Sequence, residues 1–252
     1  MDLQLARKRC LVTGASRGLG RSTAVMLAAE GCAVAVVARR AELLEELSSE
    51  IVDAGGAAPV IIVADVTDDG AVDDIINAAN EGLGGIDILI NSAGGSRPTS
   101  WDAAESEWEE GMGLNFTALR RLSPAAIPGM QENNWGRVIN LTGTVEPSGM
   151  NIANAAKSAV HAWAKGLSRD IAKDGVTVNS IAPGRLKTEQ IMERRHPDPA
   201  EREEFAERNI PVGYFGEAED LAVLAVFLAS PLARYITGEL FHVDGGMKRF
   251  AH

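Results

Sequence analysis

The chain has 252 residues and a formal net charge of −11 at pH 7. This length can bury a sizeable core in one α/β domain, and an acidic surface repels nucleic acid and anionic membranes on average. We therefore expect no nucleic-acid and no membrane partner. No stretch reaches the roughly 18 apolar residues of a membrane span, and residues 1–9 lack the apolar core of a signal peptide, so a cytoplasmic location is expected.

An apolar run at residues 10–12 breaks into glycines at positions 14, 18 and 20 and continues as a helical pattern. A glycine turn lets the backbone approach a pyrophosphate with no Cβ in the way, and the first amides of the following helix attract the negative charge. Such a pattern is weak on its own. With its order of strand, turn and helix, it indicates a nucleotide-binding cradle.

Apolar runs alternate with amphipathic segments along the rest of the chain. The predicted strands are 10–12, 33–38, 60–64, 86–90, 138–141, 176–181 and 240–243. The predicted later helices are 41–54, 68–81 (capped by Asp68), 104–132, 151–173, a short one at 201–204, and 221–228. We expect one Rossmann-like, doubly wound α/β domain over residues 1–252, whose seven parallel strands carry a ligand crevice at their carboxyl ends.

The cysteines and histidines exclude two kinds of site. Cys10 and Cys32 each begin an apolar run, so neighbouring strands would bring the thiols together. We expect a buried pair of free thiols, because a disulfide is rare in a chain with no export signal. The histidines show no metal-ligand spacing, so no metal is expected.

At this point the chain resembles the short-chain dehydrogenase/reductase family over almost its whole length. The resemblance is carried, in order, by Thr13-Gly14-(x)3-Gly18-x-Gly20, Asp65-Val66, Asn91-Ser-Ala-Gly94, Leu114-Asn115, Lys157 in a small-residue helix, Pro183-Gly184 with Thr188, and Tyr235-Ile-Thr-Gly238 running to Val243-Asp-Gly-Gly246. It implies a nicotinamide dinucleotide as the cofactor and a small molecule as the substrate.

The resemblance assigns each motif a place on the dinucleotide. The phosphates would be held by the turn of Gly14, Gly18 and Gly20, with Ser16, Arg17 and the Leu19 backbone. The adenine would contact Asp65 and Val66, and the adenosine ribose side would contact Asn91, Ala93 and Gly94. The nicotinamide ribose would be bound by Lys157, and the carboxamide by Pro183, Gly184 and Thr188. The alternative is ordinary turn chemistry, with Gly94 and Gly184 as turn glycines and Asp65 as a strand-end cap.

The charge after the second predicted strand indicates which dinucleotide binds. A carboxylate there would accept from the ribose 2′-hydroxyl of NAD and repel a 2′-phosphate. This chain instead has Ala38 followed by Arg39, and Arg17 lies in the glycine turn. Guanidiniums match the geometry of a phosphate, so we expect NADP(H). The alternative is that Arg39 and Arg40 are solvated surface charges.

Two catalytic positions implied by the resemblance are empty. The family's usual acid is a tyrosine four residues before the lysine, where the ammonium lowers the pKa of the phenol, but this chain has Ala153. Gly143 replaces the usual serine, and the loop from there to the lysine helix looks short. The groups left for catalysis, and predicted here to carry it, are Lys157, Asn115, Thr142 and Thr144.

Three functions remain open. In the first, the chain is an NADP(H)-dependent, 3-oxoacyl reductase-like enzyme, and a water held by Lys157 and Asn115, or a threonine hydroxyl, supplies the proton. In the second it is a dienoyl or enoyl thioester reductase, because dienoyl-CoA reductases of the family also lack this tyrosine and keep the lysine; no replacement tyrosine stands near Val145. In the third it is a non-catalytic NADP-binding protein that serves in assembly or sensing.

Residues 185–212 are charged and contain several prolines, which predicts a lid over the substrate; a plain surface loop is the alternative. The resemblance further implies that the helices carrying Asn115 and Lys157 pair across a two-fold axis, giving a homotetramer or a homodimer. His161 follows Lys157 by one helical turn, on the side away from the missing phenol. We therefore interpret His161 as a packing or interface residue, and Trp163 as an interface candidate.

Overall fold

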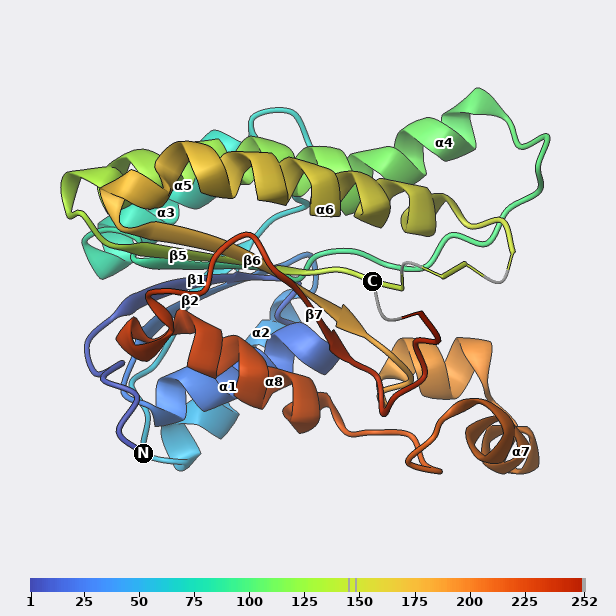
Figure 1. Ribbon diagram of the computed structural model, residues 1–252. Coiled ribbons are helices and arrows are strands. Elements are labelled where there is room, and N and C mark those ends of the chain that lie inside the picture. The colour runs from blue at the N-terminus through green and yellow to red at the C-terminus, as the bar shows by residue number, and fades with distance from the viewer. Residues whose placement is uncertain (145, 148, 251–252) are drawn as a thin grey trace.

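A parallel sheet with the strand order β3-β2-β1-β4-β5-β6-β7 forms the centre of the protein (Figure 1). The computed structural model describes residues 1–144, 146–147 and 149–250. The strands are β1 (Arg9–Thr13), β2 (Ala33–Ala38), β3 (Val60–Val63), β4 (Ile88–Asn91), β5 (Gly136–Leu141), β6 (Val176–Pro183) and β7 (Leu240–Val243). The chain winds outward in both directions from the β1–β4 pair, which confirms the predicted doubly wound sheet of seven strands.

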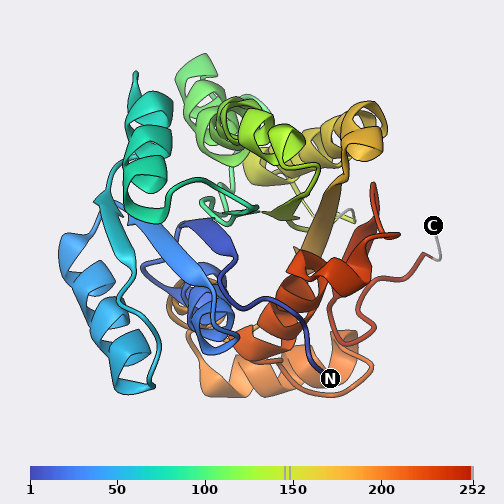
Figure 2. The same ribbon diagram turned by 90° about the vertical axis from the view of Figure 1, so that its left-hand side faces the viewer.

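Helices cover both faces of the sheet. α1, α2 and α8 lie on one face, and α3, α5 and α6 on the other (Figures 1 and 2). The helices are α1 (Gly18–Ala29), α2 (Ala41–Asp53), α3 (Ala71–Leu83), α4 (Glu105–Met112), α5 (Ala118–Glu132), α6 (Ile152–Ile171), α7 (Pro199–Asn209) and α8 (Ala218–Ala229). No helix in the described ranges is long and apolar enough to cross a membrane.

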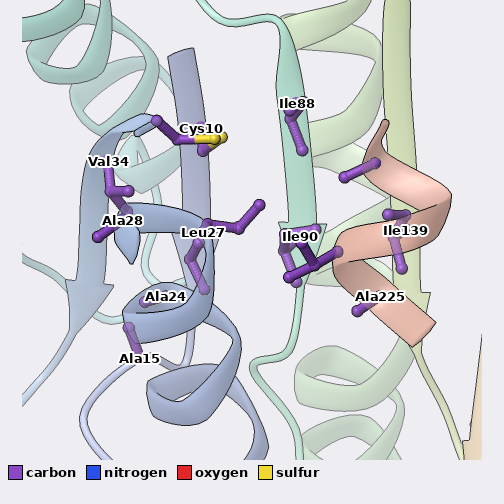
Figure 3. Close-up of a cluster of buried hydrophobic side chains, with 14 of the residues drawn as sticks. Cys10, Ala15, Ala24, Leu27, Ala28, Val34, Ile88, Ile90, Ile139 and Ala225 are labelled. Atoms are coloured by element: carbon purple, nitrogen blue, oxygen red, sulfur yellow. The ribbon is translucent and has the colours of Figure 1, made fainter. Parts of the chain in front are cut away.

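The strands are apolar on both faces because both faces are covered. Between the sheet and the α1–α8 layer, Leu27 of α1 and Ala225 of α8 belong to the same buried cluster as Ile88 and Ile90 of β4 (Figure 3). A second cluster fills the space between the sheet and α3, α5 and α6. The two clusters fix the sheet rigidly, so that its carboxyl edge can position a site.

The two cysteines are buried and free, as predicted. β1 pairs in parallel with β2, and Cys32 directly precedes β2. The Cys10 and Cys32 thiols donate to the carbonyls of Lys8 and Leu5 at 3.9 and 3.4 Å. Burial, together with the neighbouring Cys32 thiol, raises the pKa of Cys10 well above its usual value. These thiols are therefore packing groups and not nucleophiles.

Three predicted helices differ from the structure. The segment expected as one helix over 104–132 contains a π-helical turn, η1 (Gly113–Thr117), between α4 and α5. The predicted cap at Asp68 is wrong: α3 begins after Gly70, which adopts a left-handed conformation at φ 82° and starts the helix two residues later. The short helix predicted at 201–204 is longer, since Asp198 caps α7 by accepting a hydrogen bond from the Ala200 amide at 2.7 Å.

We predict that Leu27→Ala lowers the free energy of unfolding by about 2–5 kcal/mol, because the side chain is fully buried and its removal leaves a cavity. Urea unfolding followed by circular dichroism measures the loss. Val52→Ala is the matched control, because Val52 is 46 % exposed on α2. A loss for Val52→Ala as large as that for Leu27→Ala would contradict the packing described here.

Candidate active site

A cavity of about 440 Å³ lies at the carboxyl edge of the sheet, within the size range of small-molecule sites. Most residues predicted to bind the dinucleotide line it, namely Gly14, Ser16, Arg17, Gly18, Leu19, Arg39, Asp65, Val66, Ala93, Gly94, Lys157, Pro183, Gly184 and Thr188. Gly20 and Asn91 do not line the cavity. The buried Asn91 amide donates to Ser123 Oγ and Asn140 Oδ1, so it ties β4 to its neighbours.

The glycine turn after β1 is packed directly against the loop after β4. Gly14 has a left-handed φ of 65°, and a Cβ on it would lie 2.8 Å from the Ala93 amide nitrogen. A Cβ on Gly20 would lie 2.5 Å from the Gly14 carbonyl oxygen. Among the described residues no side chain caps the start of α1, so its first amides are left for a ligand. This cradle therefore fits an anionic phosphate.

Three arginines surround the cradle. Arg40 donates from Nη2 to Ser16 Oγ at 3.1 Å, and Arg39 from Nη1 to Asp65 Oδ2 at 3.3 Å. Arg17 forms an ion pair with Glu189. The sequence analysis selected Arg17 and Arg39 and left Arg40 out; the only signal for Arg40 was its position next to Arg39.

Asp65 is held in its ionised form. Burial alone would raise the pKa of this carboxyl, but hydrogen bonds from Thr67 and the Arg39 guanidinium outweigh burial and lower the pKa. The carboxylate thus fixes Arg39 at the cavity while its own loop is fixed by Thr67, whose amide donates to Asp65 Oδ1 at 3.0 Å. Asp65 therefore lines the cavity and also caps its own loop.

Asn115 lies in the π-helical turn η1, which interrupts the helix expected over 104–132. Its Nδ2 donates to the Gly111 carbonyl at 3.0 Å, and its Oδ1 accepts from the Gly95 amide at 2.9 Å. The side chain therefore ties the helix to the loop after β4, beside the cavity.

Lys157 of α6 approaches the same loop near Gly94. Its Nζ donates to the Thr142 carbonyl at 2.8 Å, and burial lowers its pKa to about 8. No carboxylate in the described part of the chain forms an ion pair with it. A Cβ on Gly94 would lie 3.0 Å from Asn115 Oδ1 and 3.9 Å from Lys157 Nζ. The amide oxygen of Asn115 and the ammonium of Lys157 thus both lie near Gly94.

Gly143 and Ala153, the two positions predicted to lack the usual catalytic side chains, differ in their surroundings. A Cβ on Gly143 would lie 3.0 Å from Lys157 Cδ, so the stem of the lysine packs over this glycine. Ala153 is 3 % exposed in the first turn of α6, and its amide donates to Asn151 Oδ1 at 3.0 Å. Ala153 does not border the cavity. Val145 lies outside the described residues.

The two predicted threonines are differently placed. Thr142 lines the cavity, but its hydroxyl donates to the Ile181 carbonyl at 3.2 Å and lies 2.8 Å from His161 Nε2. The Thr144 hydroxyl accepts from the Glu146 amide at 3.0 Å and lies outside the cavity lining. His161 packs inward against Thr142, and burial, with His242 and Lys157 nearby, lowers its pKa to about 4.

The predicted lid, residues 185–212, supplies part of the cavity wall. Thr188, Glu189, Gln190, Ile191 and Arg194 line it, the last three from the π-helical segment η3 (Gln190–Arg195). Behind this segment, α7 lies apart from the two helix layers (Figure 1). Its Phe205 stacks on His196, which accepts a hydrogen bond from Arg185 Nε at 3.2 Å. No cluster of metal ligands occurs within residues 1–144, 146–147 and 149–250.

The cavity lies where the sheet reverses its winding, between β1 and β4. It contains the glycine turn after the first strand and a buried lysine. These features are typical of a dinucleotide-binding protein of the Rossmann type. Residues 14–248 match a family model described as enoyl-(acyl carrier protein) reductase. The chain therefore belongs to the short-chain dehydrogenase/reductase family.

Curated and solved relatives match over nearly the full chain. The 3-oxoacyl-[acyl-carrier-protein] reductase of Vibrio cholerae is 36% identical over 249 residues, which cover 97% of this chain and 99% of the relative. The structure of a putative short-chain alcohol dehydrogenase from Sinorhizobium meliloti is 36% identical, with a TM-score of 0.89 and 98% of each chain covered. The structure of L-sorbose reductase from Gluconobacter frateurii with NADPH and L-sorbose is 29% identical, with a TM-score of 0.94 and coverage of 99% of this chain and 100% of that one.

We predict that Lys157 reacts with acetic anhydride as an amine of pKa about 8, because burial disfavours its ammonium form. Competitive labelling of the purified protein between pH 6 and 11, read by mass spectrometry, gives the midpoint for each lysine. The exposed Lys173 is the control for a lysine at the surface. Equal midpoints for the two lysines would contradict the burial of the Lys157 ammonium.

Proposed function

We propose that the protein is an NADP(H)-dependent oxidoreductase that transfers hydride between the nicotinamide and a keto or hydroxy substrate. The observation that carries this proposal is one cavity that joins the uncapped start of α1, three arginines and the ammonium of Lys157. The names of the relatives support it, since the Vibrio cholerae protein is a 3-oxoacyl reductase and the L-sorbose reductase binds NADPH.

The residues present fit this cofactor. The pyrophosphate would be held by Ser16 and the first amides of α1. The 2′-phosphate would be held by Arg39 and Arg40, together with Arg17. Asp65 and Val66 would contact the adenine, and Lys157 the nicotinamide ribose. The carboxamide would lie against Pro183, Gly184 and Thr188. Bound in this way, the dinucleotide supplies or accepts the hydride.

We propose that Lys157 donates the proton to the substrate oxygen, the role that a tyrosine phenol has in the family. One N–H of its ammonium is engaged by the Thr142 carbonyl, which leaves the others for the substrate oxygen or for a water shared with Asn115 Oδ1. A donor whose pKa is near 8 gives up a proton readily at neutral pH. The hydroxyls of Thr142 and Thr144 are already hydrogen-bonded within the protein, which favours Lys157 over either.

A second candidate is reduction of an enoyl or dienoyl thioester, which the description of the matching family model favours. Such a reaction adds hydride to a carbon–carbon double bond and needs less acid catalysis at a carbonyl oxygen. Incubating the protein with NADPH and a panel of 3-oxoacyl and enoyl thioesters separates the candidates by product. Tight NADPH binding without turnover of any substrate would favour the third function, a binding protein.

We also propose a homotetramer or homodimer in the cytoplasm, in which residues 185–212 close over the substrate. The adjacent free thiols of Cys10 and Cys32 support a reducing compartment. Exposed apolar side chains such as Val223 and Tyr235 support association. Trp163 packs partly against the core, which leaves it a minor part of any interface.

We predict that Arg39→Ala weakens NADPH binding about 10–100-fold and NADH binding by less than about threefold, because only the 2′-phosphate loses a charge-assisted hydrogen bond. Isothermal calorimetry with each cofactor measures the two changes, and Arg40→Ala should behave in the same way. The exposed Arg234, far along the chain from the cavity lining, provides the control Arg234→Ala. Equal weakening of both cofactors by Arg39→Ala would refute the phosphate role.

We predict that the rate of NADPH-dependent reduction is constant below pH 8 and falls about tenfold per pH unit above it, because the donating ammonium is lost as the pH passes its pKa of about 8. Lys157→Met should lower the rate at pH 7 by about 100-fold or more. Lys173→Met is the matched control on the surface. A wild-type rate that stays flat to pH 10 would exclude Lys157 as the proton donor.

A further inference from the structure

Thr142, directly after β5, is bound at two points by the same helix. Lys157 Nζ donates to the Thr142 carbonyl at 2.8 Å, and His161 Nε2 lies 2.8 Å from the Thr142 hydroxyl. Lys157 and His161 are four residues apart on α6, so both side chains project from the same face of the helix. Thr142 therefore connects the ammonium of the proposed proton donor to a histidine that the proposed function does not use.

His161 donates the hydrogen in its contact with Thr142. The Thr142 hydroxyl has one proton, which it donates to the Ile181 carbonyl at 3.2 Å, so its oxygen is left to accept from the imidazole. The imidazole is neutral at physiological pH, because burial and the nearby His242 and Lys157 lower the pKa of His161 to about 4. A neutral ring carries a single N–H, and this contact places it on Nε2.

The position of Thr142 explains why its side chain has to be held. The pairing of β5 with β6 ends one residue before Thr142. The Thr142 amide still donates to the Ile181 carbonyl at 2.8 Å, but among the described residues only Lys157 donates to the Thr142 carbonyl. The next residue is Gly143, which has no side chain to fix the peptide group that it shares with Thr142. The contacts of the hydroxyl with His161 and Ile181 therefore help to orient the carbonyl that receives the ammonium.

We propose that His161 is a positioning residue for proton transfer: by donating to the Thr142 hydroxyl, it holds the Thr142 carbonyl toward Lys157 and so fixes the ammonium at the cavity. The inference rests on the proposed function of Lys157 as the proton donor. His161 does not line the cavity, so it acts through Thr142 and Lys157, which both do. A role in packing alone would be served by an apolar side chain at this position.

Two substitutions at His161 separate positioning from packing. Leucine in His161→Leu fills the space without a hydrogen bond, whereas the amide in His161→Gln can donate as Nε2 does. Competitive labelling of the cofactor-free protein with acetic anhydride measures the pKa of Lys157, and circular dichroism monitors the fold. We expect His161→Leu to lower this pKa by at least about half a unit, because the ammonium loses the acceptor that stabilises its charged form. His161→Gln should restore the wild-type midpoint.

The rate of NADPH-dependent reduction is the second measurement. His161→Leu should lower the rate at pH 7 about tenfold and move its alkaline fall to lower pH, because a misplaced ammonium of lower pKa is lost earlier and donates less effectively. His161→Gln should keep the rate within about threefold of wild type. Ser168→Ala is the control on the same helix: its hydroxyl donates to the Lys165 carbonyl, about three turns from Lys157, and its removal should change neither measurement.

A double-mutant cycle tests whether His161 acts through Thr142. Thr142→Val removes the hydroxyl and keeps nearly the same shape, so it should lower the rate about as much as His161→Leu. The double variant should be slower than either single variant by no more than about twofold, since both changes break the same link. Effects that multiply in the double variant would overturn the positioning role, because His161 would then act independently of Thr142.

The labelling measurement needs no substrate and separates this inference from the proposed function. A lowered Lys157 midpoint in His161→Leu, in a protein that turns over no substrate, would sustain the link from His161 to Lys157 and contradict the oxidoreductase. Wild-type turnover with an unchanged midpoint and rate in His161→Leu would overturn the role of His161 and leave the oxidoreductase standing. A midpoint that falls while the rate and its pH profile stay unchanged would also overturn that role.

Discussion

The site depends on the close contact between the glycine turn after β1 and the loop after β4. Because Gly14 and Gly20 carry no Cβ, the turn can press against Ala93 at the point where the sheet reverses its winding. This contact directs the start of α1 toward the cavity and sets the position of Gly94 and its neighbours. The arginines and Lys157 line the same cavity as these two loops.

The neighbours of Lys157 are backbone and glycine, and no tyrosine stands four residues before it. Its stem packs over Gly143, its Nζ is held by the Thr142 carbonyl, and burial lowers its pKa to about 8. A buried ammonium with a depressed pKa is typical of residues that transfer protons. With Gly143 and Ala153 at the two positions expected to carry the usual catalytic side chains, we propose that the lysine itself is the acid.

The sequence was sufficient to predict the sheet and the position of the site, because continuous apolar strands and glycine turns are local signals. It did not indicate the start of α3, where the conformation of Gly70 overrides the expected cap at Asp68. The contact of Arg40 with Ser16 and the arrival of Arg194 at the cavity depend on how distant segments fold together, and no local pattern encodes them.

The central claim is that a phosphorylated nicotinamide dinucleotide binds against the turn after β1 and reaches Lys157. Calorimetric titration of the wild-type protein, freed of bound nucleotide, with NADPH and with NADH tests this claim most directly. The account predicts saturable binding of NADPH that is at least about tenfold tighter than that of NADH, as expected for one well-bound phosphate. Uptake of neither cofactor by the folded protein would contradict it.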